Sequence, residues 1–180
     1  MTALSRGTAT EPPHFIRDIL PAMSSEVVLG LALGIGVIAG LRSMTAPAVV
    51  CWAAHLHWLD LRSSRLSFLG STAAVVIVTL LAVGELVADK LPSTPNRTSI
   101  GPLVGRALAG ALCGAALGTA GGASLLLTGI AGALGAIAGA FAGYGARHRL
   151  VQNLKIPDFA IAILEDLVAI GGGLLLVSRF

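Results

Sequence analysis

Residues 31–50 read LALGIGVIAGLRSMTAPAVV, and the rest of the chain can be placed around them. Residues 31–41 are apolar or small at every position, which is typical of a helix surrounded by lipid or protein. Arg42 interrupts this pattern, and Pro47 should kink or unwind the helix near Met44, because proline removes a backbone donor and clashes with the preceding turn. Broken helices are tolerated at membrane depth only where protein or water covers the freed backbone groups. The stretch therefore predicts a discontinuous transmembrane helix that lines an internal site.

The composition supports a membrane protein. Of the 180 residues, 55% are hydrophobic and only 12% are charged, about half the charged fraction of a soluble domain. The net charge of +3 comes from scattered basic residues, which argues against a nucleic-acid partner. Cys51 and Cys113 lie in apolar segments without metal-ligand spacing, so we expect small buried hydrophobes, no metal and no cofactor.

The predicted fold is an all-α integral membrane protein with about five transmembrane helices. A flexible cytoplasmic tail, 1–25, precedes a single transmembrane domain, 26–180. The five spans are predicted at residues 27–56, 69–90, 103–118, 124–145 and 156–177. Glycines recur every four residues in the third and fourth spans, a pattern that lets helix backbones touch. We expect Gly114 and Gly139 to lie at close helix contacts.

The basic residues predict an orientation. With five spans, one side carries Arg6, Arg17, Lys90, Arg97, Arg106, Arg147, Arg149 and Lys155, and the other carries Arg62, Arg65 and Arg179. The positive-inside rule then predicts a multi-pass protein of the bacterial inner membrane, with a cytoplasmic N-terminus and a C-terminus outside.

Two pairs of short segments resemble each other. Residues 36–40 (GVIAG) recur as 135–139 (GAIAG), and residues 85–88 (ELVA) recur as 166–169 (DLVA). The two segments of each pair are three spans apart in chain order, an odd number, so they should cross the membrane in opposite directions, as in an inverted-topology repeat of spans 1–2 against spans 4–5. Helices rich in Gly and Ala also produce such matches by chance.

Several blocks resemble a known family. Residues 40–47 (GLRSMTAP), 85–92 (ELVADKLP) and 95–98 (PNRT), followed by Arg106, are similar to the blocks of the bacterial membrane family catalogued as domain of unknown function 4126. The resemblance extends over residues 27–177. It implies a multi-span membrane protein and supplies no activity, substrate or catalytic residue.

Three charged residues fall near the middle of predicted spans. A charge at the centre of a membrane helix costs roughly 2.5–3.5 kcal/mol, so Arg42, Glu165 and Asp166 should be paired across helices. We predict that Arg42 faces Asp166 in preference to Glu165. Such a pair either locks the bundle or forms a site for an ion, a proton or an anionic group.

A second group of charges is predicted at the cytoplasmic edge, where it either contributes to the site or forms a solvated network. Ser43 and Thr45 could offer hydroxyl groups where the first helix unwinds. The complete predicted substrate or ion site comprises Arg42, Ser43, Thr45, Glu85, Asp89, Arg97, Arg106, Glu165 and Asp166.

The sequence contains no GxSxG, HExxH or P-loop motif, and we therefore expect no enzyme. Three functions remain open. The first is a small secondary transporter or ion-coupled carrier, forming a homodimer, with a polar midplane site. The second is a protein that handles anionic lipids through a basic pocket between helices. The third is a structural or partner-binding subunit without transport activity.

Overall fold

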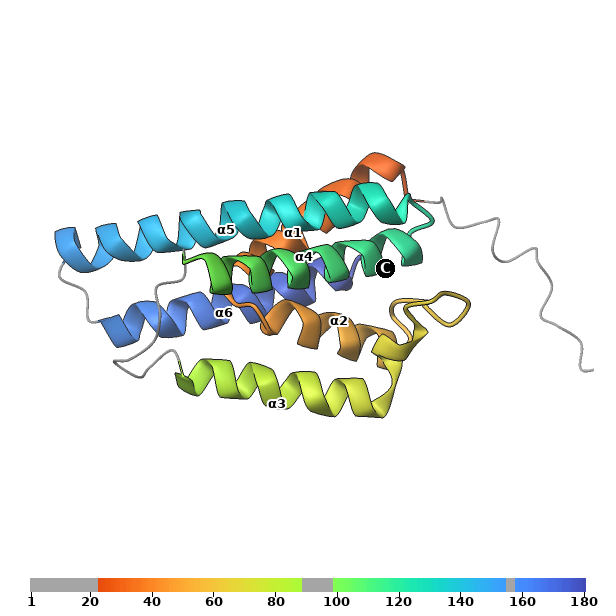
Figure 1. The fold of residues 1–180 in the computed structure, drawn as a ribbon, viewed down its shortest axis with the longest axis horizontal. Coiled ribbons are helices and arrows are strands. Elements are labelled where there is room, and N and C mark those ends of the chain that lie inside the picture. Colours follow the sequence, from red (N-terminus) through yellow and green to blue (C-terminus); the bar gives the residue numbers. More distant parts are fainter. Residues whose placement is uncertain (1–22, 89–98, 155–157) are drawn as a thin grey trace, which may run out of the picture.

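The computed structural model describes residues 23–88, 99–154 and 158–180, and these residues form a helical bundle (Figure 1). The α-helices are α1 (Ser25–Leu41), α2 (Thr45–His55), α3 (Thr72–Ala88), α4 (Ile100–Ala120), α5 (Leu125–Leu154) and α6 (Asp158–Val177), and a short 3-10 helix, η2 (Ser67–Gly70), precedes α3. No strand occurs in these described ranges, so the all-α class is confirmed there. Ser24 caps α1 by accepting a hydrogen bond from the backbone N–H of Val27.

Three helices of the described chain are long and apolar enough to cross a membrane: Ile100–Ala120, Leu125–Leu150 and Ala160–Val177. Two shorter apolar helices, Ser25–Leu41 and Thr72–Val87, accompany them. The span predicted at residues 103–118 is therefore longer than expected, and its 21 residues suffice for a complete crossing.

The break predicted near Met44 is present, but its geometry differs from the prediction. α1 ends at Leu41, α2 begins at Thr45, and the chain reverses direction between them (Figure 1). Ile38 of α1 packs on Gly172 and Val49 of α2 packs on Gly173, so two residues far apart in one continuous helix lie at the same level of α6. The prediction of one kinked span over residues 27–56 is wrong. The two helices instead form a hairpin, which we call the α1–α2 hairpin, with its turn at residues 42–44.

This reversal overturns the predicted orientation. Gly121, in the turn between α4 and α5, lies against both Val28 near the start of α1 and Phe180 at the end of the chain. The start of α1 and the C-terminus therefore lie at the same end of the bundle (Figure 1). A cytoplasmic N-terminus with an external C-terminus is wrong for this arrangement. The basic-residue count failed because it grouped the N-terminal tail with loops joined to the opposite end.

The directions of the helices also contradict the predicted inverted repeat. Gly36 of α1 packs on the backbone of Gly132, and Gly40 packs on that of Ala136, so the contacts advance in the same direction along both helices. α1 and α5 therefore run parallel, although an inverted repeat requires them to be antiparallel. The other matched pair, α3 and α6, runs in opposite directions (Figure 1). One inverted repeat cannot relate both pairs, and this prediction is wrong.

The predicted close glycine contacts are confirmed. A Cβ atom at Gly139 would meet the backbone of Val37 on α1, and one at Gly114 would meet the backbone carbonyl of Thr128 on α5. Small residues thus allow α1, α4 and α5 to pack backbone to backbone, as expected for membrane helices. α3 lies at the edge of the bundle, where it packs on α2 (Figure 1). This arrangement fixes the position of the hairpin turn among the surrounding helices.

Candidate functional site

The end of α1 leaves backbone carbonyl groups without helical partners, and Arg106 of α4 binds two of them. Its Nη1 donates to the carbonyl oxygen of Gly40 and to that of Leu41, the latter at 3.0 Å. The C-terminus of a helix carries a partial negative charge, so a guanidinium group is favourable there. The carbonyl groups that the chain reversal frees are thus covered by a buried cation.

The start of α2 leaves backbone N–H groups without partners, and Glu85 of α3 binds them. Glu85 Oε1 accepts from the Ser43 backbone N–H at 2.8 Å and from the Ser43 hydroxyl at 2.6 Å. Glu85 Oε2 accepts from the Met44 backbone N–H at 2.8 Å. Met44 itself provides no side-chain cap, so the carboxylate of a neighbouring helix performs that task. Pro47 fits the first turn of α2, where a missing N–H leaves no helical bond unmade.

The two capping residues also contact each other. Arg106 Nη2 lies 3.8 Å from Glu85 Oε1, and the two side chains are only 5% and 13% exposed. The sequence analysis predicted that Glu85 and Arg106 belong to a second group of charges at the cytoplasmic edge, and one alternative for this group was a solvated network. That alternative is wrong for this pair, because both side chains are largely buried and bind the hairpin turn.

The predicted contact between Arg42 and Asp166 is confirmed. Arg42 Nη2 lies 2.5 Å from Asp166 Oδ1, with the arginine side chain fully buried and the aspartate 17% exposed. Arg42 follows the last residue of α1, and its backbone N–H donates to the carbonyl oxygen of Ile38. The guanidinium group therefore crosses from the turn to α6. Whether the pair binds a substrate or ion remains a prediction.

Glu165 takes part in a different pair. Its Oε2 atom lies 3.7 Å from Arg147 Nη1 on α5. The sequence analysis counted Arg147 only among the basic residues on one side of the membrane, because the predicted fourth span stopped at residue 145. Since α5 continues to Leu154, Arg147 lies on the helix, where it reaches α6. Its spacing of four residues from Gly143, in the glycine series of that helix, could have indicated the same face.

Together these residues form one polar cluster around the hairpin turn, which we call the turn cluster. Its charged members are Arg42, Glu85, Arg106, Arg147, Glu165 and Asp166, with Ser43 as its hydroxyl group. Arg106 lies six residues into α4, roughly 9 Å from the start of that helix. Arg106 therefore lies between the start of α4 and its middle, and the position of the cluster relative to a membrane midplane stays a prediction.

Of the three remaining predicted site residues, one lies in the described structure. Thr45 is buried at the start of α2, and Asp89 and Arg97 lie outside the described residues. Cys51 and Cys113 are both buried in the hydrophobic core and form no disulfide. Within residues 23–88, 99–154 and 158–180, no three His, Cys, Asp or Glu side chains gather as a metal site would require.

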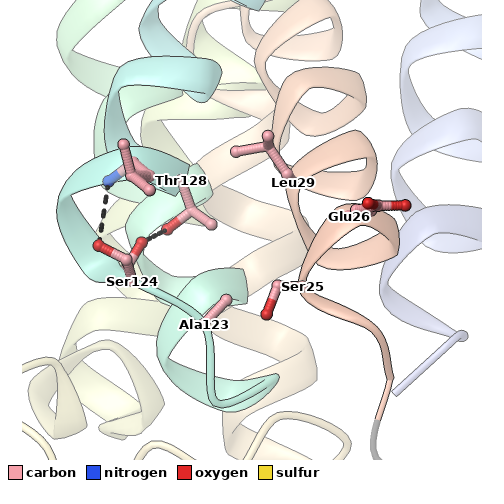
Figure 2. A pocket seen from close by; sticks show the side chains of 7 residues that line it. Ser25, Glu26, Leu29, Ala123, Ser124 and Thr128 are labelled. Carbon is pink, nitrogen blue, oxygen red and sulfur yellow. Dashed lines mark hydrogen bonds between the residues drawn. The ribbon is translucent and has the colours of Figure 1, made fainter.

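A pocket lies at the other end of the hairpin, between the first turns of α1 and α5 (Figure 2). Ser25, Glu26 and Leu29 line one side, and Ser124 and Thr128 line the other. The Thr128 hydroxyl donates to the backbone carbonyl of Ser124 at 2.8 Å, so it is engaged within α5. This pocket has no contact with the turn cluster.

The sequence model of one family, the domain of unknown function 4126, matches residues 29–178. Comparison with curated proteins and with solved structures yields no match. The match extends over nearly all of the helical bundle, so the chain belongs to this family.

Proposed function

We propose that this member of the family is a small secondary carrier of the bacterial inner membrane, with the turn of the α1–α2 hairpin as its moving element. In this proposal α3, α4, α5 and α6 cross the membrane. The α1–α2 hairpin enters from the end of the bundle that also holds the C-terminus, and its turn lies inside the bundle. The membrane domain then contains five elements, as the sequence suggests, but the first is re-entrant.

One observation supports this proposal above the others: a break in the helical backbone lies inside the bundle and is surrounded by charged residues. A polypeptide that only anchors to lipid gains nothing from such a break, because each charge at membrane depth costs roughly 2.5–3.5 kcal/mol. Carriers commonly place the ends of broken helices at the site where ions and solutes bind. The turn cluster has this composition, with helix ends and both signs of charge at one point.

The contacts that hold the hairpin turn would allow the turn to move. The broken ends of the hairpin are held by Glu85 of α3 and Arg106 of α4, which belong to other helices. These polar contacts can be exchanged for contacts with water or a solute without opening the glycine-packed interface of α1 with α5. Release of the turn would expose the cluster at the end where α3 finishes and α4 begins.

Flux in proteoliposomes tests the proposal. The purified protein is reconstituted, and entry of protons, sodium, potassium, chloride and phosphate is measured under imposed gradients, with movement of fluorescent lipid between leaflets measured in parallel. We expect ion flux above that of protein-free vesicles, equal in the wild type and in the control Glu26→Gln. Glu26 is exposed at the start of α1, far from the turn.

Two results would overturn the proposal. Lipid movement without ion flux would make this a lipid-handling protein instead. The absence of both, in protein that remains folded in the vesicles, would leave a structural or partner-binding subunit.

A further inference from the structure

We propose that the coupling ion of this carrier is the proton and that Glu85 binds it. The coupling of this proton to transport rests on the proposed carrier function, whereas the effect of the proton on the hairpin turn does not. Protonation of Glu85 releases the turn, and deprotonation fastens it. Glu85 is thus both the proton-binding group and the latch of the α1–α2 hairpin.

The hydrogen bonds of Glu85 require its ionised form. Two backbone N–H groups and one hydroxyl donate to its carboxylate oxygens. An ionised carboxylate is an acceptor only, whereas a protonated one carries a donor of its own and loses acceptor capacity. The bonds that remain also lose charge assistance, which makes them weaker. Protonation therefore leaves at least one N–H of the turn without a good acceptor.

The proton on Glu85 also affects the C-terminal end of α1, on the other side of the break. Arg106 holds the carbonyl groups of Gly40 and Leu41 and lies 3.8 Å from Glu85. When Glu85 becomes neutral, Arg106 loses a nearby countercharge in a largely buried location. Both ends of the broken helix are thus weakened by one event.

The charged groups around the turn contact different acidic residues. Arg106 of α4 lies beside Glu85, whereas the guanidinium group of Arg42, at the turn, lies against Asp166 of α6. Glu165 lies beside Arg147. Glu85 accepts hydrogen bonds from the backbone N–H groups of Ser43 and Met44, and so its protonation acts directly on the turn.

A metal cation fits the same location less well. Sodium would be coordinated by backbone carbonyl oxygens freed at a helix end, as in other broken-helix carriers. Here the Arg106 guanidinium group binds the carbonyl oxygens of Gly40 and Leu41 and acts as a fixed cation. The exchangeable charge at the break is therefore the carboxylate, which exchanges a proton. Glu85 takes this proton from water on one side of the membrane and returns it to water on the other, with no other bond formed or broken.

Hydrogen exchange measured by mass spectrometry on the full-length protein tests the latch without any transport assay. The readout is the exchange of backbone amides at residues 43 and 44, corrected for the intrinsic pH dependence of exchange. At one fixed pH, Glu85→Gln should accelerate this exchange by at least roughly tenfold, the low end of the effect of losing one hydrogen bond to a charged group. Glu26→Gln, a matched change at an exposed position, should leave it unchanged.

A pH series on the wild type keeps the test decisive even if Glu85→Gln fails to fold. Protection of the two amides should fall as the pH is lowered, and in folded Glu85→Gln it should be low and independent of pH. Equal protection at every pH in the wild type would overturn the proposal. So would normal protection in Glu85→Gln.

The latch and the carrier function can fail separately. A turn that responds to pH in protein without any ion flux would retain the latch and remove the carrier function. Sodium-driven or potassium-driven flux with a turn insensitive to pH would retain the carrier function and remove Glu85 as the proton site.

Discussion

The pair of Arg42 and Asp166 offers a quantitative test of the turn cluster. The arginine side chain is fully buried, and its Nη2 atom lies 2.5 Å from the aspartate Oδ1 atom. Removing one partner of a buried ion pair typically costs about 3–5 kcal/mol, because the other charge stays buried without compensation. We therefore expect Asp166→Asn to destabilise the protein by about this amount.

The two single changes should not be equivalent. An arginine cannot lose its proton in a protein, so Asp166→Asn leaves a permanent charge in the bundle. Arg42→Met leaves Asp166, which is 17% exposed and can become neutral by binding a proton, and it should therefore be less destabilising. The double variant should be more stable than the sum of the single effects predicts, by about 2 kcal/mol.

A double-mutant cycle on unfolding in mixed micelles, followed by circular dichroism, measures this coupling. The exposed pair of Arg62 and Asp60 serves as the control, because its atoms lie 3.9 Å apart with side chains 73% and 63% exposed. Its coupling should not exceed about 0.5 kcal/mol. Additivity within about 0.5 kcal/mol for Arg42 and Asp166 would refute the pairing and its part in the turn cluster.

Three further predictions follow from the packing and the hairpin. Gly139→Leu should destabilise the fold in detergent by more than about 1 kcal/mol, because its side chain would meet the backbone of Val37, whereas Gly84→Leu, with open space around the position, should have little effect on the melting temperature. Arg106→Gln should destabilise the protein by about 1–3 kcal/mol in the same thermal assay, since two carbonyl groups lose a charged donor; an unchanged melting temperature would contradict the capping role. Reporter fusions at the N-terminus and after Phe180 should report the same side of the membrane, and opposite sides would contradict the hairpin.

The sequence was sufficient to predict the apolar helices after the first span and the ion pair of Arg42 with Asp166. Apolar runs marked the helices, and the cost of an isolated charge in lipid required a partner for Arg42. The glycine spacing also predicted the contacts of Gly114 and Gly139, since that spacing acts within a helix whatever its direction.

The sequence could not provide the direction of the chain after the break near Met44. A proline and a polar residue in an apolar run are compatible with a kink or with a full reversal, and both interrupt the same hydrogen bonds. What decides between them is tertiary: Glu85 and Arg106, distant in sequence, cover the broken ends and make the reversal stable. The orientation and the repeat both depended on that choice, and both predictions were wrong together.

Disulfide cross-linking in native membranes tests most directly whether the chain reverses inside the bundle and carries its polar centre at the turn. Cys51 and Cys113 are replaced by alanine, and two cysteine pairs are compared: Ile38→Cys with Gly172→Cys, and Val49→Cys with Gly173→Cys. The hairpin predicts that both pairs cross-link, because both contacts occur at neighbouring residues of α6. In a continuous helix, positions 38 and 49 would lie roughly 16 Å apart along the axis. Cross-linking of only one pair would contradict the hairpin, and with it the proposed carrier and the Glu85 latch.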